Sequence, residues 1–291
     1  MNYHVRHRTT YHYEDAVSVS HHLLHLTPRN FGRQTCRESH LSIVPAPQVT
    51  REHRDYFGNL LTSFSLDEPH ECLIVEANSD LEVSRPDGPD FSISQRWDSV
   101  RDAFGGEARG EMLDAYQFVF DSQRVSANPQ FAAYARASFP DGRPLLEAAL
   151  DLTHRIHQDF LFDKKATEVA TPVASFFEKR RGVCQDFAHF EIACLRSLGL
   201  AARYVSGYLR TIPPPGRPRL RGADASHAWC SAWCAEAGWV DFDPTNDCVP
   251  ADGHITLAWG RDYSDVSPIY GVLRGGARHR LQVEVDVEPV G

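Results

Sequence analysis

The chain has 291 residues, of which 42% are hydrophobic and 24% are charged. This size and composition are those of a globular protein with one large domain or two modest ones, and they exclude a disordered or fibrous chain. The net charge of −9 argues against a general nucleic-acid-binding protein and against a protein that binds anionic membrane surfaces.

Hydropathy and cysteine usage together indicate a compartment. No apolar run approaches the roughly 20 residues that a membrane-spanning helix requires. Residues 1–8 alternate charged and apolar side chains and lack the hydrophobic stretch of a signal peptide. The chain has seven cysteines, and an odd number without a signal peptide favours reduced thiols over a disulfide framework. We therefore expect a cytoplasmic protein that does not contact a membrane.

Residues 1–85 have the pattern of short strands. Val17 and Val19 alternate with serine, at the period of two that a half-buried strand shows. A tight turn is predicted at residues 55–59, where glycine and asparagine tolerate a positive φ. The other predicted strands lie at residues 41–44, 51–55, 60–66, 72–76 and 81–84. Short strands at this spacing predict a β-rich N-terminal domain over residues 1–85, arranged like a sandwich or a small barrel.

A cluster of breakers, Arg-Pro-Asp-Gly-Pro at residues 85–89, predicts a domain boundary. Beyond it, apolar residues recur at three- and four-residue steps, as in the buried stripe of a helix. We expect a helical connector from about residue 98 to residue 160. It opens a second domain, residues 86–291, and the whole chain is therefore expected to be an α+β protein.

The second domain has one helix, starting at residue 184, that is apolar over a wide arc and is expected to lie centrally, with Gly199 as its C-terminal cap. Strands are predicted after it, at residues 202–209, 226–234, 239–243 and 281–287. The proline-rich segment at residues 211–222 is expected to be a lightly packed loop. It is either a rim or lid over the neighbouring site or an ordinary surface loop.

Cys184 stands at the start of this central helix. Unpaired backbone N–H groups and the helix dipole favour an anion there, and Lys179, Arg180 and Arg181 add positive charge nearby. A thiolate in this position is a candidate nucleophile. The alternative is an inert packing cysteine, which is the usual role of a free cysteine.

A thiolate nucleophile works best beside a histidine that exchanges its proton and is itself oriented by a third group. His227 lies on the predicted strand after the proline-rich loop, and Asp243 ends the next strand. The two side chains share a face only if the hairpin register is even, as when Cys234 pairs with Gly238, or if the hairpin contains a bulge. Asp241 has the same parity as Asp243 and is the alternative carboxylate.

The same part of the sequence allows other kinds of site. Cys230 and Cys234 with His227 could suggest zinc, but the histidine falls on the opposite face of the strand and packing is favoured. The chain has no calcium-loop or nucleotide-binding motif, so no cofactor is expected. Gln185 either assists an oxyanion or sits in the first helix turn, with the Cys184 backbone N–H as the favoured oxyanion donor. Asp186 is expected to interact with the helix dipole.

Long segments follow one another in the order and content of one known family. They are residues 182–189, 203–209, 224–229 and 238–246, with weaker matches at residues 55–59 and 258–266. These segments closely resemble the bacterial transglutaminase-like family, and the resemblance covers nearly the whole chain. It differs at Cys230 and Cys234, where family members more often have aliphatic or polar residues.

The resemblance implies a papain-like core with a central nucleophile helix packed on an antiparallel sheet, behind an N-terminal β-rich region. It places the family's catalytic triad on Cys184, His227 and Asp243. The implied reaction is attack on a glutamine side chain or peptide amide through a thioester, followed by transfer to an amine. A cysteine peptidase or amidase using the same triad, and a non-catalytic binding or assembly protein that retains the fold, are the alternatives. The expected partner is a protein or peptide substrate.

Overall fold

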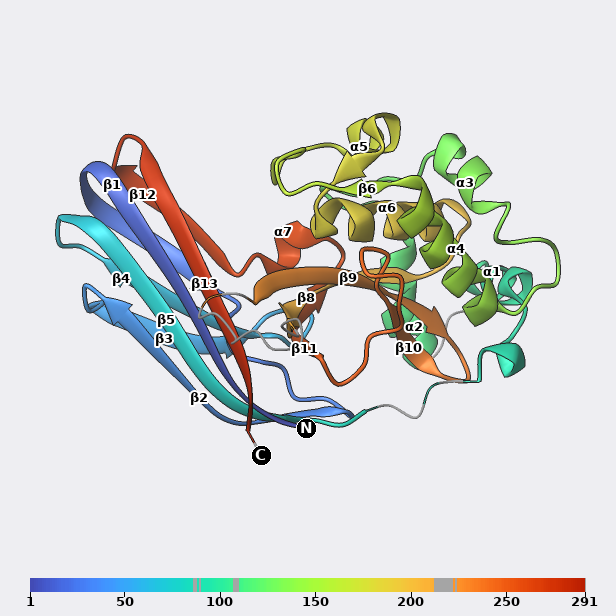
Figure 1. The fold of residues 1–291 in the computed structure, drawn as a ribbon, viewed down its shortest axis with the longest axis horizontal. Helices are drawn as coiled ribbons and strands as arrows, with labels where there is room; N and C mark the ends of the chain where they lie inside the picture. The colour runs from blue at the N-terminus through green and yellow to red at the C-terminus, as the bar shows by residue number, and fades with distance from the viewer. Residues whose placement is uncertain (86–87, 89, 107–109, 212–221, 223, 291) are drawn as a thin grey trace, which may run out of the picture.

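The computed structural model describes the chain except for residues 86–87, 89, 107–109, 212–221, 223 and 291. Two parts lie side by side in Figure 1, a sheet of long strands and a core in which helices pack against a smaller sheet. The proline-rich segment predicted as a loop falls mostly outside the described residues. No helix in the described part of the chain is long and apolar enough to cross a membrane.

The larger sheet is antiparallel and has seven strands. Its central strand β1 is flanked by β5 and β4, with β2 and β3 outside them, and β12 and β13 pair with the other edge of β1. The strands are β1 (Asn2–Leu24), β2 (Gln34–Val44), β3 (Val49–Arg54), β4 (Leu60–Leu66), β5 (His70–Val83), β12 (Ile269–Gly275) and β13 (His279–Val290). The prediction of a β-rich N-terminal region is confirmed.

Strand β1 joins two halves of this sheet. Its first half lies between β5 and β13, its second half lies between β4 and β12, and its register against β5 shifts between His12 and Val17. Buried side chains from β1, β4 and β5, including Phe64 and Val75, form a hydrophobic core of their own. This core is separate from the larger hydrophobic core that contains α6.

The last two strands correct the sequence analysis. Residues 281–287 were assigned to the second domain, but β13 pairs with β1 from Asn2 to Tyr13. Residues 269–290 therefore complete the N-terminal sheet, and β12, which was not predicted, belongs to it as well. The alternating pattern of a strand shows which face is buried but not which strand lies beside it. In the structure, the neighbour of β13 is β1.

The second part is built around helix α6 and a four-stranded antiparallel sheet with the order β10-β9-β8-β11. The strands are β8 (Ala202–Leu209), β9 (Ala225–Cys234), β10 (Gly238–Phe242) and β11 (His254–Gly260), with a short parallel pair, β6 (Leu161–Phe162) and β7 (Arg181–Gly182). The helices are α1 (Trp97–Phe104), α2 (Glu111–Tyr116), α3 (Pro129–Ala135), α4 (Leu145–Asp159), α5 (Val173–Lys179), α6 (Cys184–Ser197) and α7 (Tyr263–Val266), with 3₁₀ turns at Phe91–Ile93 and Gln117–Val119. The predicted helical connector corresponds to α1 through α4.

Helix α6 is central, as predicted. Its residues from Gln185 to Arg196 are all buried, and it packs on β8 and β9 on one side and on α3, α4 and α5 on the other. Phe190 is fully buried among the rings of Phe160, Phe176 and Phe177. Because α6 has apolar residues over a wide arc, it is stable only where other elements cover it on several sides. The α6 N-terminus is consequently fixed in space by the packed core.

Candidate active site

The first turn of α6 holds Cys184 in a defined position. Val183 precedes it in extended backbone, and the Asp186 carboxylate accepts the Val183 backbone N–H at 2.8 Å and the Thr167 hydroxyl at 2.5 Å. A Cβ on Gly182 would lie 2.5 Å from Asp186 Oδ2 and 2.7 Å from a Phe176 ring carbon, so only glycine fits there. Burial raises the pKa of Asp186, against these hydrogen bonds. Asp186 thus acts through specific hydrogen bonds as well as through the helix dipole.

The β9–β10 hairpin has the even register. Gly238 pairs with Cys234 and Phe242 pairs with Cys230, which places Asp243 beside the end of the ladder on the face of His227. His227 Nε2 lies 2.7 Å from Asp243 Oδ2. The alternative carboxylate, Asp241, binds elsewhere, because it accepts hydrogen bonds from Ser231 and Arg33.

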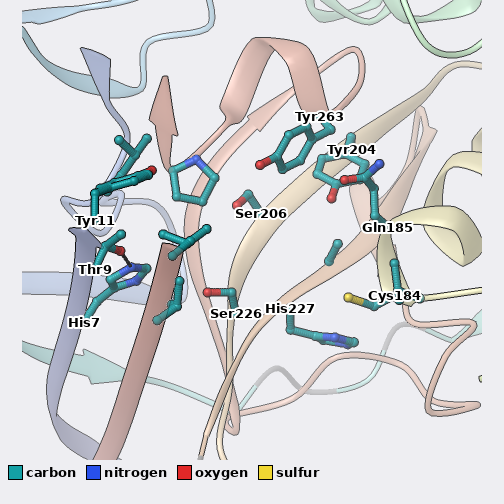
Figure 2. Close-up of a pocket in the computed structure, with 16 residues that line it drawn as sticks. His7, Thr9, Tyr11, Cys184, Gln185, Tyr204, Ser206, Ser226, His227 and Tyr263 are labelled. Atoms are coloured by element: carbon teal, nitrogen blue, oxygen red, sulfur yellow. Dashed lines mark hydrogen bonds between the residues drawn. The ribbon is translucent and has the colours of Figure 1, made fainter. Parts of the chain in front are cut away.

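The Cys184 sulfur lies beside the His227 ring, and Figure 2 shows the two side chains directed toward one another from α6 and β9. Because Asp243 takes Nε2, the other ring nitrogen of His227 is left for the thiol. Burial alone would lower the pKa of His227, but its hydrogen bonds with Asp243 and Cys184 and the charges of both outweigh that effect and raise it to about 10. The imidazole therefore favours its protonated form beside the sulfur.

Asp243 is fully buried and its carboxylate is surrounded by donors. His254 Nε2 lies 3.0 Å and Asn246 Nδ2 lies 2.8 Å from Oδ2, and the backbone N–H groups of Thr245 and Asn246 lie 3.0 and 3.2 Å from Oδ1. Burial would raise the pKa of Asp243, but the hydrogen bonds from His227 and His254 hold it well below its usual range. A buried carboxylate with so many donors stays ionised and can orient an imidazolium.

Sequence reasoning missed His254. It lies on β11, which was not predicted as a strand, and it is brought to Asp243 only because β11 pairs with β8. Asn246 falls inside a segment that carried the family resemblance, but nothing in the pattern singled it out. Only the paired sheet shows that both side chains converge on one carboxylate.

No residue set outside this cluster in the described part of the chain has the geometry of a metal site. His227, Asp243 and His254 offer one atom each within 4.8 Å of one another. Direct hydrogen bonds from both imidazoles to Asp243 account for that proximity. Cys230 is fully buried and Cys234 donates to Glu236 at 3.0 Å, so the two cysteines considered for zinc serve in packing and local hydrogen bonding.

A cavity of about 270 Å³ opens in front of the thiol, between the two parts of the molecule. The core lines one side and the large sheet lines the other, as Figure 2 shows. Its lining includes Cys184, Gln185, Tyr204, Ser206, His227 and Tyr263 from the core and His7, Thr9, Tyr11, Leu281 and Val283 from the sheet. The contribution of the large sheet could not be foreseen, because it depends on how the two parts pack.

Two cavity residues bear on the stabilisation of a developing anion. Gln185 Nε2 donates to the Val169 backbone carbonyl at 3.0 Å, so its amide is already engaged. The Tyr204 hydroxyl points into the cavity in Figure 2. Burial and the neighbouring Cys184 raise the pKa of Tyr204, which keeps its hydroxyl protonated as a donor. The arrangement as a whole can generate a thiolate, exchange a proton at the imidazole and accept a carbonyl group in a partly enclosed space.

Two family models match the chain. Residues 3–82 match the bacterial transglutaminase-like N-terminal region, and residues 132–244 match the transglutaminase-like superfamily. The chain is 40% identical to the uncharacterized protein Rv2569c of Mycobacterium tuberculosis, over 99% of this chain and 92% of that protein. It is also 34% identical to a protein-glutamine gamma-glutamyltransferase of Pseudomonas aeruginosa, but over only 43% of this chain and 20% of that enzyme.

Solved structures support the fold. A putative cysteine protease from Cytophaga hutchinsonii superposes with a TM-score of 0.75, at 19% identity, and the alignment covers 100% of this chain and 92% of that one. At this identity the likeness concerns the arrangement of the chain and not its reaction. Together with the two family matches and the full-length relative, it leads to one conclusion: the chain belongs to the transglutaminase-like superfamily and carries that family's bacterial N-terminal region.

Proposed function

We propose that the protein is a thiol-dependent acyl-transfer enzyme that attacks an amide through Cys184, His227 and Asp243. The observation that carries the proposal is the convergence of the three side chains at the mouth of one cavity, with His227 Nε2 2.7 Å from Asp243 and its other side toward the thiol. A protein or peptide carrying a glutamine side chain or a reactive peptide bond is the substrate class. We propose a cytoplasmic location for the reaction.

In the proposed reaction His227 holds the proton of Cys184 as the thiolate attacks the amide carbonyl carbon. The negative charge that develops on the carbonyl oxygen is stabilised by the Cys184 backbone N–H, with the Tyr204 hydroxyl as a further donor. The imidazolium of His227 then gives its proton to the departing nitrogen, and ammonia or an amine leaves behind a thioester on Cys184. Asp243 keeps the imidazole oriented and stabilises its charged form.

The thioester is then attacked by a second nucleophile, and His227 removes its proton. An amine gives a new amide, whereas water gives a carboxylic acid, and both restore the free thiol. We propose transfer to an amine as the principal outcome, supported by the family to which the chain belongs and by the cavity, whose apolar lining limits water near the thioester. Peptide hydrolysis is the second candidate, because the same three side chains serve when water takes the place of the amine.

The test combines labelling with turnover. Iodoacetamide should alkylate Cys184 faster than the other cysteines, as measured by mass spectrometry of the digested protein. Incorporation of monodansylcadaverine into a glutamine-containing protein, with ammonia release measured in parallel, distinguishes transfer from hydrolysis. Cys184→Ala should abolish both, whereas Cys36→Ser, at a free cysteine of the large sheet, should leave both unchanged.

A wild-type protein that turns over no amide, and whose Cys184 is alkylated no faster than Cys36, would exclude the enzyme and favour a binding or assembly role. Ammonia release without amine incorporation would assign the chain to the hydrolases. The two readouts therefore separate the three functions that the fold can support.

A further inference from the structure

Strand β13 has one edge that is not taken up by β1. Among the described residues this outer edge makes a single isolated bridge, in which the Asp224 backbone N–H donates to the Val285 carbonyl at 3.2 Å. The Val287 N–H points the same way and donates to the Asp224 carboxylate at 2.6 Å. Backbone groups alternate sides along a strand, so Leu281 and Val283 present their N–H and C=O groups to this outer side as well.

Two further observations agree with this parity. The carbonyl of Arg278, at an even position, accepts the backbone N–H of Glu14 at the β1 side. Pro289, at an odd position, sits within β13 opposite Tyr3 although it has no N–H to donate. Proline is tolerated in a strand where its nitrogen faces away from the neighbouring strand. The odd positions of β13 therefore do not use their N–H groups to hold β13 to β1.

The side chains of Leu281 and Val283 lie on the face of the sheet that lines the cavity. They pair across the ladder with Tyr11 and Thr9, which line it too. Leu281 is 51% exposed and Val283 is 46% exposed, although apolar side chains of this size are usually covered. This wall of the cavity carries no charged side chain, and burial lowers the pKa of the adjacent His7 to about 4, so His7 is neutral as well.

The same cavity contains the Cys184 sulfur and the His227 ring, on the opposite wall (Figure 2). We propose that the outer edge of β13 at Leu281 and Val283 is the substrate groove of the enzyme, and that it binds an extended peptide segment with uncharged apolar side chains beside the reactive amide. This inference rests on the proposed function, because it names the substrate segment for that site. The peptide would add one strand to the large sheet and place alternate side chains against Leu281, Val283 and Tyr11.

An extended peptide fits this place better than a compact small molecule. A strand added at this edge would form hydrogen bonds with the outward N–H and C=O groups of residues 281 and 283. These groups recur at every second residue, which is also the spacing of the apolar side chains that face the cavity. A peptide so bound runs along the wall opposite the thiol. Its reactive side chain or peptide bond can then reach across the cavity to Cys184.

The experiment measures binding and turnover separately. The probes are acetyl-Leu-Val-Gln-Val-Leu-amide, its counterpart with serine in place of leucine and valine, and two versions of the first, one N-methylated at the glutamine and one at the valine that follows it. Fluorescein-labelled forms give dissociation constants by anisotropy on Cys184→Ala protein. We expect the apolar probe to bind about tenfold more tightly than the serine probe. Because the N–H groups of adjacent residues point to opposite edges of a strand, N-methylation at one of the two positions should remove most of that gain and N-methylation at the other should not.

Variants of β13 supply the matched controls. Val283→Pro removes an outward N–H without touching the ladder to β1 and should weaken binding of the apolar probe about tenfold. Val283→Asp keeps the N–H but places a charge beside the apolar probe, and it should weaken binding of that probe. This second variant keeps the proposal testable if the proline variant does not fold. Gln282→Ser, with its side chain on the other face of the sheet, should leave binding unchanged.

The proposed groove would be excluded by equal dissociation constants for the apolar and serine probes, or by unchanged binding after both Val283 substitutions. If the free edge instead pairs two copies of this chain, light scattering would show a dimer that Val283→Pro converts to a monomer with unchanged peptide affinity, which also overturns it. Selective binding of the apolar probe to Cys184→Ala protein, with no turnover of any amide by the wild type, would keep the groove and exclude the proposed reaction.

Discussion

The two larger sheets of this molecule are both antiparallel, but their strands have different surroundings. Seven of the eight residues of β8 are buried, because helices and the large sheet cover the four-stranded sheet. All six residues of β3, at the edge of the large sheet, are exposed. A covered sheet constrains nearly every side chain, whereas an open sheet constrains one face and leaves the edge strands free. Substitutions should therefore have large effects in the first sheet and small effects in the second.

The largest effect is expected where the covered sheet meets the site. Asp243→Asn removes the charge that orients and protonates His227, and it should lower kcat/KM for amide turnover by roughly 10²–10⁴-fold. The matched control is Asp241→Asn, two residues earlier and within β10, whose carboxylate binds Ser231 and Arg33 instead. Steady-state kinetics of both variants provide the measurement. Equal losses in the two would show that strand stability, and not the triad, explains the effect.

A large effect on stability is expected in the packed core. Phe190→Ala leaves a hole among stacked rings and should lower the free energy of unfolding by about 3–5 kcal/mol. Val49→Ala on β3, where the side chain is 49% exposed, should change it by no more than about 0.5 kcal/mol. Urea denaturation followed by circular dichroism measures both. A cost at Val49 comparable to that at Phe190 would contradict the contrast between the packed core and the open sheet.

The buried ion pair should also make stability depend on pH. The pKa of His227 is raised from 6.5 to about 10 in the folded protein, so its contribution is fully present below about pH 6.5 and is lost as the pH rises through 10. The stability difference between the wild type and His227→Gln should therefore shrink between pH 6.5 and pH 10.5. Urea midpoints at three pH values test this. A difference that grows with pH would mean that His227 is neutral in the folded protein.

The smallest effect is expected on the open sheet. Arg37 and Glu82 form an ion pair at 2.6 Å with both side chains about half exposed, at 56% and 49%. Exposed pairs of this kind contribute about 0–1 kcal/mol. Arg37→Gln should therefore shift the thermal midpoint by only a few degrees at low salt, and the shift should vanish in high salt. A salt-independent loss would indicate that β2 is held more tightly than its exposure suggests.

The same contrast explains what could be predicted from the sequence. The ends of β8, β9 and β10 were predicted within a residue, because apolar runs there stop at glycine, proline or a turn, whereas β11 was not predicted. The triad required either an even hairpin register or a bulge, and the ladder, in which Gly238 pairs with Cys234, has the even register. The transglutaminase-like family was also identified correctly, from motifs that lie in or beside this sheet.

The large sheet was predicted less completely. The periodicity identified β13 as a strand but could not tell that it pairs with β1, because a strand with one apolar face fits any open edge of matching length. His254 was missed for a related reason, since its approach to Asp243 depends on the pairing of β11 with β8. A residue whose role depends on long-range strand pairing has no recognisable pattern in the sequence around it. The residues of the large sheet that line the cavity are of this kind.

The pairing of β1 with β13 also has a consequence for biosynthesis. Arg6 on β1 and Asp286 on β13 are 280 positions apart in the chain yet lie within 3.4 Å of one another. Strand β1 therefore leaves the ribosome about 280 residues before the strand that covers its second edge, and such long-range contacts form slowly. The part of the cavity wall that β13 supplies, Leu281 and Val283, is synthesised after the helix that carries Cys184. A nascent chain can fold its thiol-bearing helix while the cavity that would hold a substrate does not yet exist.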